Sequence, residues 1–431
     1  MKFQAIKGVR DILPPESALW NRVEQTAREV FGTFGFAEIR LPIFEQTDLF
    51  ARSVGQETDI VSKEMYSFED RDETSISLRP EATASVVRAY IQHGMQTLPG
   101  NVKLHYMGPM FRRERPQKGR YRQFYQIGAE VLGASDAPGI DAEVIEMLMT
   151  LFERLKLKGA VLNINSIGDK NCRPAYVEKL RAELVKVREQ LGEDSKRRIE
   201  TNPLRVLDSK LEQEQGIIEK LPRIAEHLCE NCREHYAEVK RQLGLRGIVY
   251  QENWRLVRGL DYYMRTTFEI TAPGLGSQNA VCGGGRYDGL VELLGGPATT
   301  KGIGFAIGTD RLVLSLQEAG EDAAQDGPAG KAAGPDVYLA WFGAAAQSAA
   351  IGLAKRLRDA GFVVELPAVE MKFGKSLGLA DRLGSRHAVI VGDDELAAGI
   401  VTVKRLSDGA QQKVGEQELF SYLRTAQNPG I

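Results

Sequence analysis

Residues 111–124 read FRRERPQKGRYRQF, and this short stretch decides the fold of the chain. It contains five arginines and one lysine but only one acid, Glu114. A charge run of this density is usually a solvated surface, so alone it would indicate little. The stretches on either side change that interpretation, because each has the pattern of a β-strand.

Downstream of the charge run, residues 124–131 alternate between two faces of a predicted strand. The polar face holds Phe124, Gln126, Gly128 and Glu130. Upstream, residues 104–110 (LHYMGPM) also have strand character. We therefore predict a long antiparallel hairpin with the arginines at its tip. Arginines above a polar stripe suit a polyphosphate and a second anionic partner.

This hairpin resembles motif 2 of the class II aminoacyl-tRNA synthetases, and residues 114–124 (ERPQKGRYRQF) resemble the histidyl-tRNA synthetases in particular. The resemblance implies that Arg112 holds the α-phosphate of ATP, where a fixed guanidinium can follow the negative charge as it develops. It implies that Glu114 also belongs to the ATP site. The tRNA acceptor end would be approached by Arg115, Gln117 and Arg120.

Residues 302–316 (GIGFAIGTDRLVLSL) look like motif 3 of the same class. Thr309 is the predicted N-cap of a helix and Asp310 its first-turn acid. Arg311 lies so near the helix N-terminus that its positive charge opposes the helix dipole. This unfavourable placement indicates that Arg311 has a functional role. The resemblance implies that Arg311 stacks on adenine and contacts the γ-phosphate. Pro42 resembles the motif 1 proline of a dimer interface, which implies a homodimer.

Two further segments resemble signatures of the histidyl enzymes, residues 254–263 (WRLVRGLDYY) and 280–290 (AVCGGGRYDGL). The resemblance implies that Arg258 reaches the α-phosphate from the side opposite Arg112, a role that other class II enzymes can give to a metal. No metal ligand is expected among the site residues. Three tyrosines would line a histidine pocket, namely Tyr262, Tyr263 and Tyr287.

The polar face of the hairpin completes that pocket with Gln126 and Glu130. A neutral imidazole has one donor and one acceptor nitrogen, so a carboxylate beside a tyrosine hydroxyl can recognise both. Such a pair discriminates well, because a substrate without the imidazole leaves buried polar groups unpaired. In residues 78–84 (LRPEATA), Glu81 and Thr83 match the family positions that hold the substrate's amino group. Without the family, Glu81 would simply be a first-turn helix acid.

Length and composition limit the possible number of domains and the class of protein. At 431 residues, with 43% hydrophobic and 26% charged residues, the chain has the composition of a globular protein of two or three domains. Its 56 basic and 58 acidic residues nearly balance, so net charge neither supports nor excludes a nucleic-acid partner. We expect a cytoplasmic protein, because the sequence has four cysteines, no apolar signal segment and no apolar run long enough to span a membrane.

Periodicity and composition divide the chain. Apolar spacing predicts helices over 15–34 and 80–93, and a strand over 248–257. The region about 170–247 is rich in Glu, Lys, Arg and Leu, which predicts a helical insertion. Residues 319–335 (AGEDAAQDGPAGKAAGP) lack a periodic pattern and are predicted to be a linker. The remainder, 336–431, alternates strands and helices.

The predicted fold class is a multidomain α+β and α/β protein. Residues 1–325 would form a class II synthetase catalytic domain, with an antiparallel sheet and the helical insertion. The resemblance implies that residues 336–431, a small α/β domain, bind the anticodon.

A cysteine cluster offers a different chemistry. His227, Cys229, Cys232 and His235 fall within nine residues, and four potential ligands of this kind can indicate zinc. However, one short helix cannot easily wrap four ligands tetrahedrally around an ion. We favour side chains packed within the helical insertion, with a structural zinc as the alternative.

Taken together, the resemblance implies a dimeric histidine–tRNA ligase that uses ATP with Mg²⁺, L-histidine and tRNA(His), and has no membrane association. The alternative is a non-catalytic, histidine-binding regulatory subunit of ATP phosphoribosyltransferase. Such paralogues generally lack the C-terminal domain and part of the segment around Arg258, whereas this sequence contains both.

Overall fold

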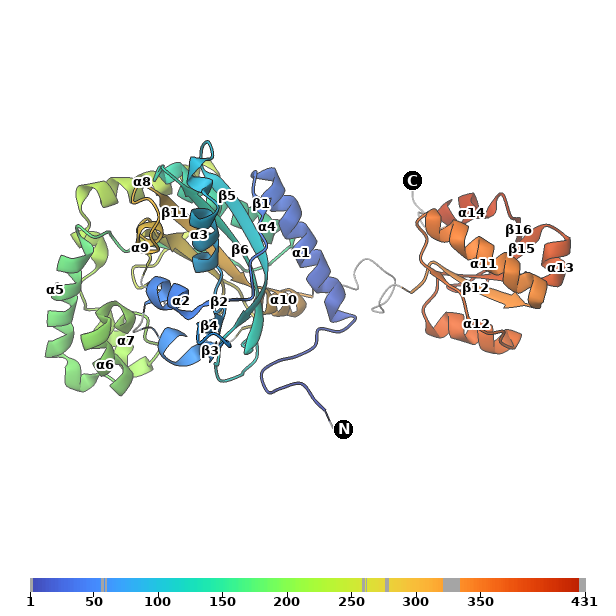
Figure 1. The fold of residues 1–431 in the computed structure, drawn as a ribbon, viewed down its shortest axis with the longest axis horizontal. Helices are drawn as coiled ribbons and strands as arrows, with labels where there is room; N and C mark the ends of the chain where they lie inside the picture. Colours follow the sequence, from blue (N-terminus) through green and yellow to red (C-terminus); the bar gives the residue numbers. More distant parts are fainter. Residues whose placement is uncertain are drawn as a thin grey trace. The chain divides into compact units, whose positions relative to one another are not determined.

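A computed structural model defines residues 3–55, 58, 60–257, 260, 262–275, 279–320 and 334–425 of this chain. The chain forms two compact units, Met1–Asp322 and Ala323–Ile431 (Figure 1). Each unit has its own sheet and its own hydrophobic core. Within the described ranges, no helix is both long and apolar enough to cross a membrane.

The larger unit is built on an eight-stranded sheet. In spatial order its strands are β1 (Ala37–Glu38), β5 (Val102–Phe111), β6 (Gln123–Gly133), β11 (Lys301–Gly308), β10 (Ala280–Arg286), β9 (Met264–Thr271), β7 (Val161–Ser166) and β8 (Gln251–Glu252). The inner strands run antiparallel, and the short edge strands β1 and β8 pair in parallel with their neighbours. The predicted hairpin is the β5–β6 pair, which extends beyond the predicted strands at both ends.

Helix α1 (Glu16–Thr33) packs against one face of this sheet. Its buried residues are Leu19, Trp20, Val23, Ala27, Val30 and Phe31, which follow the spacing that predicted the helix. Trp20 meets the ring of Tyr125 on β6 with centroids 5.2 Å apart, and Phe31 lies 6.0 Å from Phe305 on β11. Because strand side chains alternate, the even-numbered residues of β6 point to the opposite face.

A smaller sheet and five further helices complete this part of the unit. The sheet has the order β2 (Phe44–Gln46), β4 (Ser75–Leu78), β3 (Tyr66–Glu69). The helices are α2 (Thr47–Val54), α3 (Thr83–Gln92), α4 (Pro138–Arg154), α9 (Leu290–Leu293) and α10 (Thr309–Glu318). Helix α3 begins later than the predicted helix 80–93, so Pro80 and Glu81 precede it. Thr309 was predicted as an N-cap but is the first residue of α10, and Gly308 is the N-cap.

The region predicted to be a helical insertion is mainly helical. Its helices are α5 (Arg173–Lys186), α6 (Glu193–Thr201), α7 (Glu212–Ile218) and α8 (Glu230–Leu245), joined by short 3₁₀ segments. They enclose a core that includes Tyr176, Leu180, Leu184, Ile199 and Val206. The strand predicted over 248–257 is reduced to β8, because the chain turns where the Leu256 amide donates to the Asn253 carbonyl at 2.9 Å.

The smaller unit is a five-stranded α/β domain, as the alternating pattern predicted. Its sheet has the order β13 (Val364–Glu365), β12 (Val337–Phe342), β14 (His387–Gly392), β15 (Ile400–Arg405), β16 (Gln411–Gly415). The first three strands are parallel and the last two antiparallel. Its helices are α11 (Ala344–Asp359), α12 (Phe373–Arg382), α13 (Asp393–Ala397) and α14 (Leu419–Thr425). The sequence patterns did not predict β16, α13 or α14.

Candidate active site

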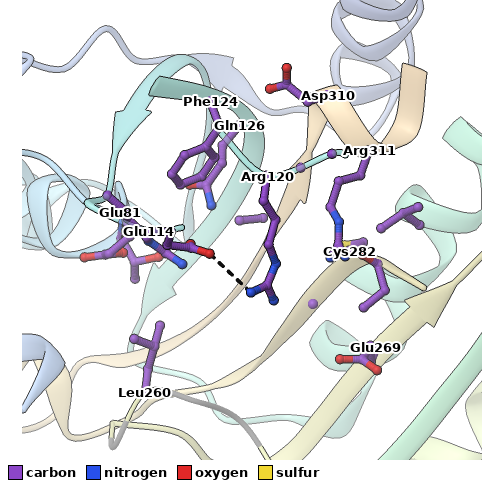
Figure 2. A pocket seen from close by; sticks show the side chains of 18 of the residues that line it. Glu81, Glu114, Arg120, Phe124, Gln126, Leu260, Glu269, Cys282, Asp310 and Arg311 are labelled. Carbon is purple, nitrogen blue, oxygen red and sulfur yellow. Dashed lines mark hydrogen bonds and ion pairs between the residues drawn. The ribbon is translucent and has the colours of Figure 1, made fainter. Parts of the chain in front are cut away.

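A cavity of about 230 Å³ lies on the sheet face opposite α1 (Figure 2). Its walls come from the β5–β6 hairpin, the central strands β9, β10 and β11, and the starts of α3 and α10. Many of the residues predicted from the motifs line it, namely Glu81, Thr83, Arg112, Glu114, Arg120, Gln126, Tyr262, Tyr263 and Arg311. Segments more than 200 positions apart therefore meet at one place.

Strand register and glycine explain how a carboxylate fits beneath this cavity. Glu130 of β6 lies opposite Gly304 of β11. A Cβ on residue 304 would collide with Glu130 Oε2, so glycine is required there. A Cβ on Gly302 would collide with the ring of Tyr287 in the same way. The glycines of β11 thus make room for a buried carboxylate and a buried phenol.

Glu130 is the centre of a buried hydrogen-bond network. The Tyr287 hydroxyl donates to Glu130 Oε2 at 2.5 Å, and the Thr83 hydroxyl donates to Oε1 at 2.7 Å. Burial raises the pKa of Glu130 to about 8, and the two hydrogen bonds oppose that rise only in part. The carboxyl group is therefore positioned by two partners on different elements, and burial makes its ionised form costly.

The Glu81 carboxylate accepts hydrogen bonds from the first turn of α3. Its Oε2 accepts a 2.6 Å bond from the Thr83 amide, and its Oε1 accepts a 3.0 Å bond from the Ala84 amide. These bonds satisfy two helix N-terminal donors that would otherwise lack partners. Burial raises the pKa of Glu81, and the amide bonds oppose this. Glu81 is thus neither a first-turn acid nor a solvated one, because it precedes the helix and faces the cavity.

The Tyr106 hydroxyl and Gln126 Oε1 are among the buried polar atoms of this cavity that make no hydrogen bond within the described residues. Buried polar groups normally have a partner, so such atoms at a cavity indicate a polar ligand. Tyr106 was not predicted from the sequence. It pairs with Gly128 across the hairpin and therefore shares the polar face, so extending the alternation to the upstream strand would have identified it.

Three tyrosines form an aromatic group at this end of the cavity. The ring of Tyr262 lies 4.7 Å from that of Tyr263 and 5.8 Å from that of Tyr287, measured between centroids. Tyr262 and Tyr263 line the cavity, whereas Tyr287 and its hydrogen-bond partner Glu130 lie outside the lining. The predicted histidine-pocket tyrosines therefore lie together.

The other end of the cavity is cationic. Arg112 Nε donates to the Pro80 carbonyl at 2.9 Å, and its guanidinium lies 5.2 Å from the ring centroid of Phe124. Arg311 Nη1 donates to the Ala280 carbonyl at 2.6 Å. Burial and the nearby charge of Arg120 lower the pKa of Arg311. Positive groups held close together in this way favour an anion between them.

The third arginine belongs to the hairpin loop. Arg120 Nη1 donates to Glu114 Oε2 at 3.2 Å, the pair drawn with a dashed line in Figure 2. The amides and carbonyls of Gln117 and Arg120 also pair, which closes the loop into a tight turn. Gln117 and Arg115 are exposed and do not line the cavity. Of the three residues predicted to meet tRNA, only Arg120 therefore faces the cavity.

Asp310 joins the two arginine-bearing segments. Its Oδ2 accepts a 2.9 Å bond from the Tyr125 amide of β6, and its Oδ1 accepts a 3.2 Å bond from Arg10. The Arg10 guanidinium also lies 4.9 Å from the ring centroid of Tyr121 in the hairpin loop. The N-terminal segment thus fixes the hairpin against α10, a role that sequence analysis did not assign to Arg10.

Arg258, predicted to reach the α-phosphate, lies outside the described residues. The cavity lining also includes residues that were not assigned from the sequence, among them Glu269 and Cys282. Glu269 of β9 pairs with Gly283 of β10, which pairs with Ala306 of β11 opposite Gly128, so Glu269 lies on the same sheet face as the hairpin's polar stripe.

A second cavity of about 690 Å³ adjoins the cationic end. Its lining includes Arg112, Arg120 and Arg311, which also line the first cavity. The helical region contributes Arg198, Arg205 and Lys210. Acidic residues also line this cavity, namely Glu64, Glu114, Asp194, Asp208 and Glu269, so its charge is mixed, with basic residues on both the hairpin side and the helical side.

Comparisons with known proteins agree with this geometry. The family profile described as Histidyl-tRNA synthetase matches residues 8–312, and the profile described as Anticodon binding domain matches residues 336–426. The chain is 53% identical to the Histidine--tRNA ligase of Solibacter usitatus, over 99% of this chain and 100% of that protein. It is 52% identical to the Histidine--tRNA ligase of Koribacter versatilis, over 98% and 96%.

The fold also matches a solved structure. The apo histidyl-tRNA synthetase of S. aureus superposes with a TM-score of 0.80 at 37% identity, covering 98% of this chain and 100% of that one. The predicted fold class, a class II catalytic core followed by an α/β anticodon-binding domain, is confirmed.

Proposed function

The chain belongs to the histidyl-tRNA synthetase family, and we propose that the 230 Å³ cavity is where it activates histidine. As a histidine–tRNA ligase, a class II aminoacyl-tRNA synthetase, it catalyses two steps. The histidine carboxylate attacks the α-phosphorus of ATP, giving histidyl-adenylate and pyrophosphate. A ribose hydroxyl of the tRNA's terminal adenosine then takes the histidyl group and releases AMP.

The observation that carries the proposal is the buried Glu130 between Tyr287 and Thr83. We assign Glu130 to the imidazole, one of whose nitrogens would donate to the carboxylate. Tyr263 and Tyr106 line the cavity, and the Tyr106 hydroxyl, which has no hydrogen-bond partner among the described residues, can serve the other nitrogen. A side chain without two ring nitrogens would leave these buried groups unpaired, which gives the specificity.

The substrate's amino group would be bound at the start of α3. Glu81 is buried with its two oxygens already on backbone amides, so its carboxylate is fixed in place. The ammonium group of the substrate would place a positive charge beside the Glu81 carboxylate. That charge would lower the pKa of Glu81, opposite to the effect of burial. Thr83 and Gln126 would provide the remaining polar contacts, and Tyr262 the wall.

The cationic end would bind the triphosphate. Arg112 would hold the α-phosphate and Arg311 the adenine and γ-phosphate, with Arg258 on the opposite side of the α-phosphate. The carbonyl bonds to Arg112 and Arg311 hold both guanidinium groups before substrate arrives. Electrostatic groups held in this way stabilise the charge of the transition state without reorganisation.

We propose that Mg²⁺ accompanies ATP. Two carboxylates, Glu114 and Glu269, line the cavity beside the arginines. Mg²⁺ is usually held by one or two carboxylates together with substrate phosphates, so this pair fits. Bound there, the ion would neutralise part of the triphosphate charge.

Transfer RNA would reach the site through the larger cavity. The hairpin loop, with Arg115, Gln117 and Arg120, would contact the acceptor end at the cavity mouth. Arg198, Arg205 and Lys210 would bind its phosphates from the helical insertion, about 170–247. The domain 336–431 would bind the anticodon, after a catalytic domain over 1–325 and a linker at 319–335.

We also propose a homodimer and a cytoplasmic location. The small sheet β2–β4–β3 exposes Ile43, Phe44 and Phe68, an apolar group beside Pro42 that a second copy would bury. The unpaired state of Cys172, Cys229, Cys232 and Cys282 is consistent with a reducing compartment. Sedimentation analysis of the full chain, with Phe44→Asp as the disrupting variant, tests the dimer.

The function is tested by charging of tRNA(His) with each of twenty labelled amino acids. Charging with histidine alone is expected. Histidine binding without charging would instead indicate the regulatory subunit considered as the alternative.

A further inference from the structure

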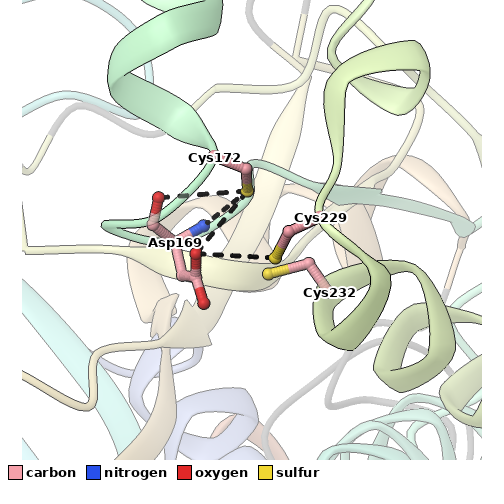
Figure 3. Close-up of side chains that lie close together, drawn as sticks. All are labelled: Asp169, Cys172, Cys229 and Cys232. Atoms are coloured by element: carbon pink, nitrogen blue, oxygen red, sulfur yellow. Dashed lines mark hydrogen bonds between the residues drawn. The ribbon is translucent and has the colours of Figure 1, made fainter.

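Three cysteines and an aspartate converge at a place that the proposed reaction does not use. Asp169, Cys172, Cys229 and Cys232 each offer one ligand atom, and all four atoms lie within 4.8 Å of one another. Figure 3 shows the four side chains pointing toward a common centre. Asp169, Cys172 and Cys232 are buried, and Cys229 is partly exposed. We propose that this cluster is a structural zinc site with three thiolates and one carboxylate.

The ligands differ from those that the sequence suggested. His227 stacks on Tyr176 and contacts Lys179, and His235 contacts the Asp136 carbonyl at 3.1 Å. Neither histidine belongs to the cluster. In their place the loop after β7 supplies Asp169 and Cys172, 57 or more positions upstream in sequence. Two separate segments therefore supply the ligands, and together they can surround an ion.

The spacing and distances fit zinc. The two ligand pairs have the form D-x₂-C and C-x₂-C, the short spacing found in structural zinc sites. Zinc–sulfur bonds of about 2.3 Å place tetrahedral sulfurs about 3.8 Å apart. The 4.8 Å limit on the cluster therefore requires movements of about 1 Å or less on binding. A tetrahedral set dominated by sulfur favours zinc over magnesium or calcium.

Surrounding structure holds the ligands in place. Gly168 has a φ of +66°, and a Cβ there would lie 2.7 Å from Cys172 Sγ, so glycine lets the loop fold tightly against the thiol. The Asn171 amide donates to Asp169 Oδ1 at 2.9 Å, and Arg265 lies 3.7 Å from Oδ2. Outer contacts of this kind orient the ligands of metal sites.

Two helices begin at the cluster. Cys172 is the N-cap of α5 and Cys229 is the N-cap of α8, and neither cap residue makes a side-chain capping bond. The positive ends of both helix dipoles therefore face the sulfur atoms and favour negatively charged ligands. The ion would fasten both helices of the insertion to the loop after β7.

The site is also connected to the histidine pocket. Arg173, which follows Cys172, donates to the Tyr263 carbonyl at 2.5 Å. Cys172, Cys232 and Tyr263 share one buried hydrophobic core. Loss of the ion is therefore expected to loosen the insertion and the backbone of Tyr263 together. This last consequence rests on the proposed function, whereas the metal site does not.

Metal content of the purified full chain is the direct test. After gel filtration with a weak chelator, elemental analysis is expected to find one zinc ion per chain. The double variant Cys229→Ser/Cys232→Ser should lose it, and Cys282→Ser, which alters the cysteine outside the cluster, should retain it. Asp169→Cys should also retain zinc, since four thiolates form a complete site. Zinc-free wild type, iron in place of zinc, or full zinc in the double variant would overturn the proposal.

A spectroscopic measurement covers the case in which the double variant does not fold. The wild-type chain, stripped of metal and reloaded with Co²⁺, should show the ligand-field bands of tetrahedral cobalt and thiolate charge-transfer absorption. Octahedral cobalt without charge transfer, or a Cys229–Cys232 disulfide in freshly purified protein, would refute the site. Neither measurement depends on ligase activity, so this result and that of the charging assay are independent.

Discussion

Tyr287 and Glu130, 157 positions apart in the sequence, are joined by a 2.5 Å hydrogen bond beneath the proposed active-site cavity. The bond links the segment after β10 to the hairpin strand β6, and glycines at 302 and 304 make room for both side chains. The carboxylate is thereby fixed before substrate binds. Preorganisation of this kind is what a pocket needs to discriminate one amino acid from others.

Glu130→Gln keeps the shape of the side chain and removes its charge. The variant should lower kcat/KM for histidine by about 10- to 150-fold, because a hydrogen bond to a charged group contributes about 1.5–3 kcal/mol. Most of the loss should be in KM for histidine, with KM for ATP nearly unchanged. Tyr287→Phe, which removes only the hydroxyl, should show a smaller loss in the same direction. An equal loss for both substrates would contradict the assignment of Glu130 to the imidazole.

The raised pKa of Glu130 predicts a pH dependence of stability. In the ligand-free folded state its pKa is about 8, against 4.5 when unfolded, so between these values the folded chain binds more protons than the unfolded chain. The contribution of Glu130 to the free energy of unfolding is therefore fully present below pH 4.5 and is lost as the pH rises toward 8. The unfolding free energy of the wild type relative to Glu130→Gln, measured by urea unfolding across this range, should fall as the pH rises. A pH-independent difference would mean that Glu130 is already ionised.

Arg112→Ala should affect chemistry more than binding. The rate of adenylate formation should fall by about 10²- to 10³-fold, the usual loss when one preorganised group at a developing charge is removed. Single-turnover kinetics can separate this rate from the affinities for ATP and histidine. Arg113→Ala is the matched control, because Arg113 is exposed and does not line the cavity. Arg258→Ala is expected to behave like Arg112→Ala. Equal effects on rate and affinity would show that these arginines mainly hold the substrate.

Gly304→Ala tests the close approach of β11 to Glu130. The new methyl group would collide with Glu130 Oε2, so the strand or the carboxyl group must move. We expect a loss of about 1–3 kcal/mol in unfolding free energy, typical of overpacking, and a raised KM for histidine. Gly244→Ala in α8 has open space around it and should be neutral or slightly stabilising. Unchanged stability and KM in Gly304→Ala would show that β11 and Glu130 are not tightly packed against each other.

The sequence predicted those parts of the site that follow a local period. Alternation along 124–131 placed Gln126 and Glu130 on one face, and the strand register agrees. It did not identify Tyr106, because that requires knowing which residue pairs with Gly128. Arg10 and Asp310 meet across 300 positions, and no local pattern indicates such a contact.

The ligands of the cysteine cluster also could not be predicted from local sequence patterns. From the sequence, Cys229 and Cys232 were grouped with the nearest histidines, His227 and His235. In the structure the chain returns from the helical insertion to the loop after β7, so the neighbours are Asp169 and Cys172. Ligand sets that close a long loop depend on tertiary packing, which spacing alone does not specify.

Amino-acid-dependent exchange between ATP and pyrophosphate, without tRNA, tests the central claim most directly. Each of the twenty amino acids would be assayed separately with the full chain and Mg²⁺. Exchange with histidine alone is the predicted result, because we propose that adenylation and its specificity both arise at the cavity that Arg112 lines and beneath which Glu130 lies. Absence of exchange with every amino acid, while histidine still binds, would contradict the assignment of this cavity as a site of histidine activation.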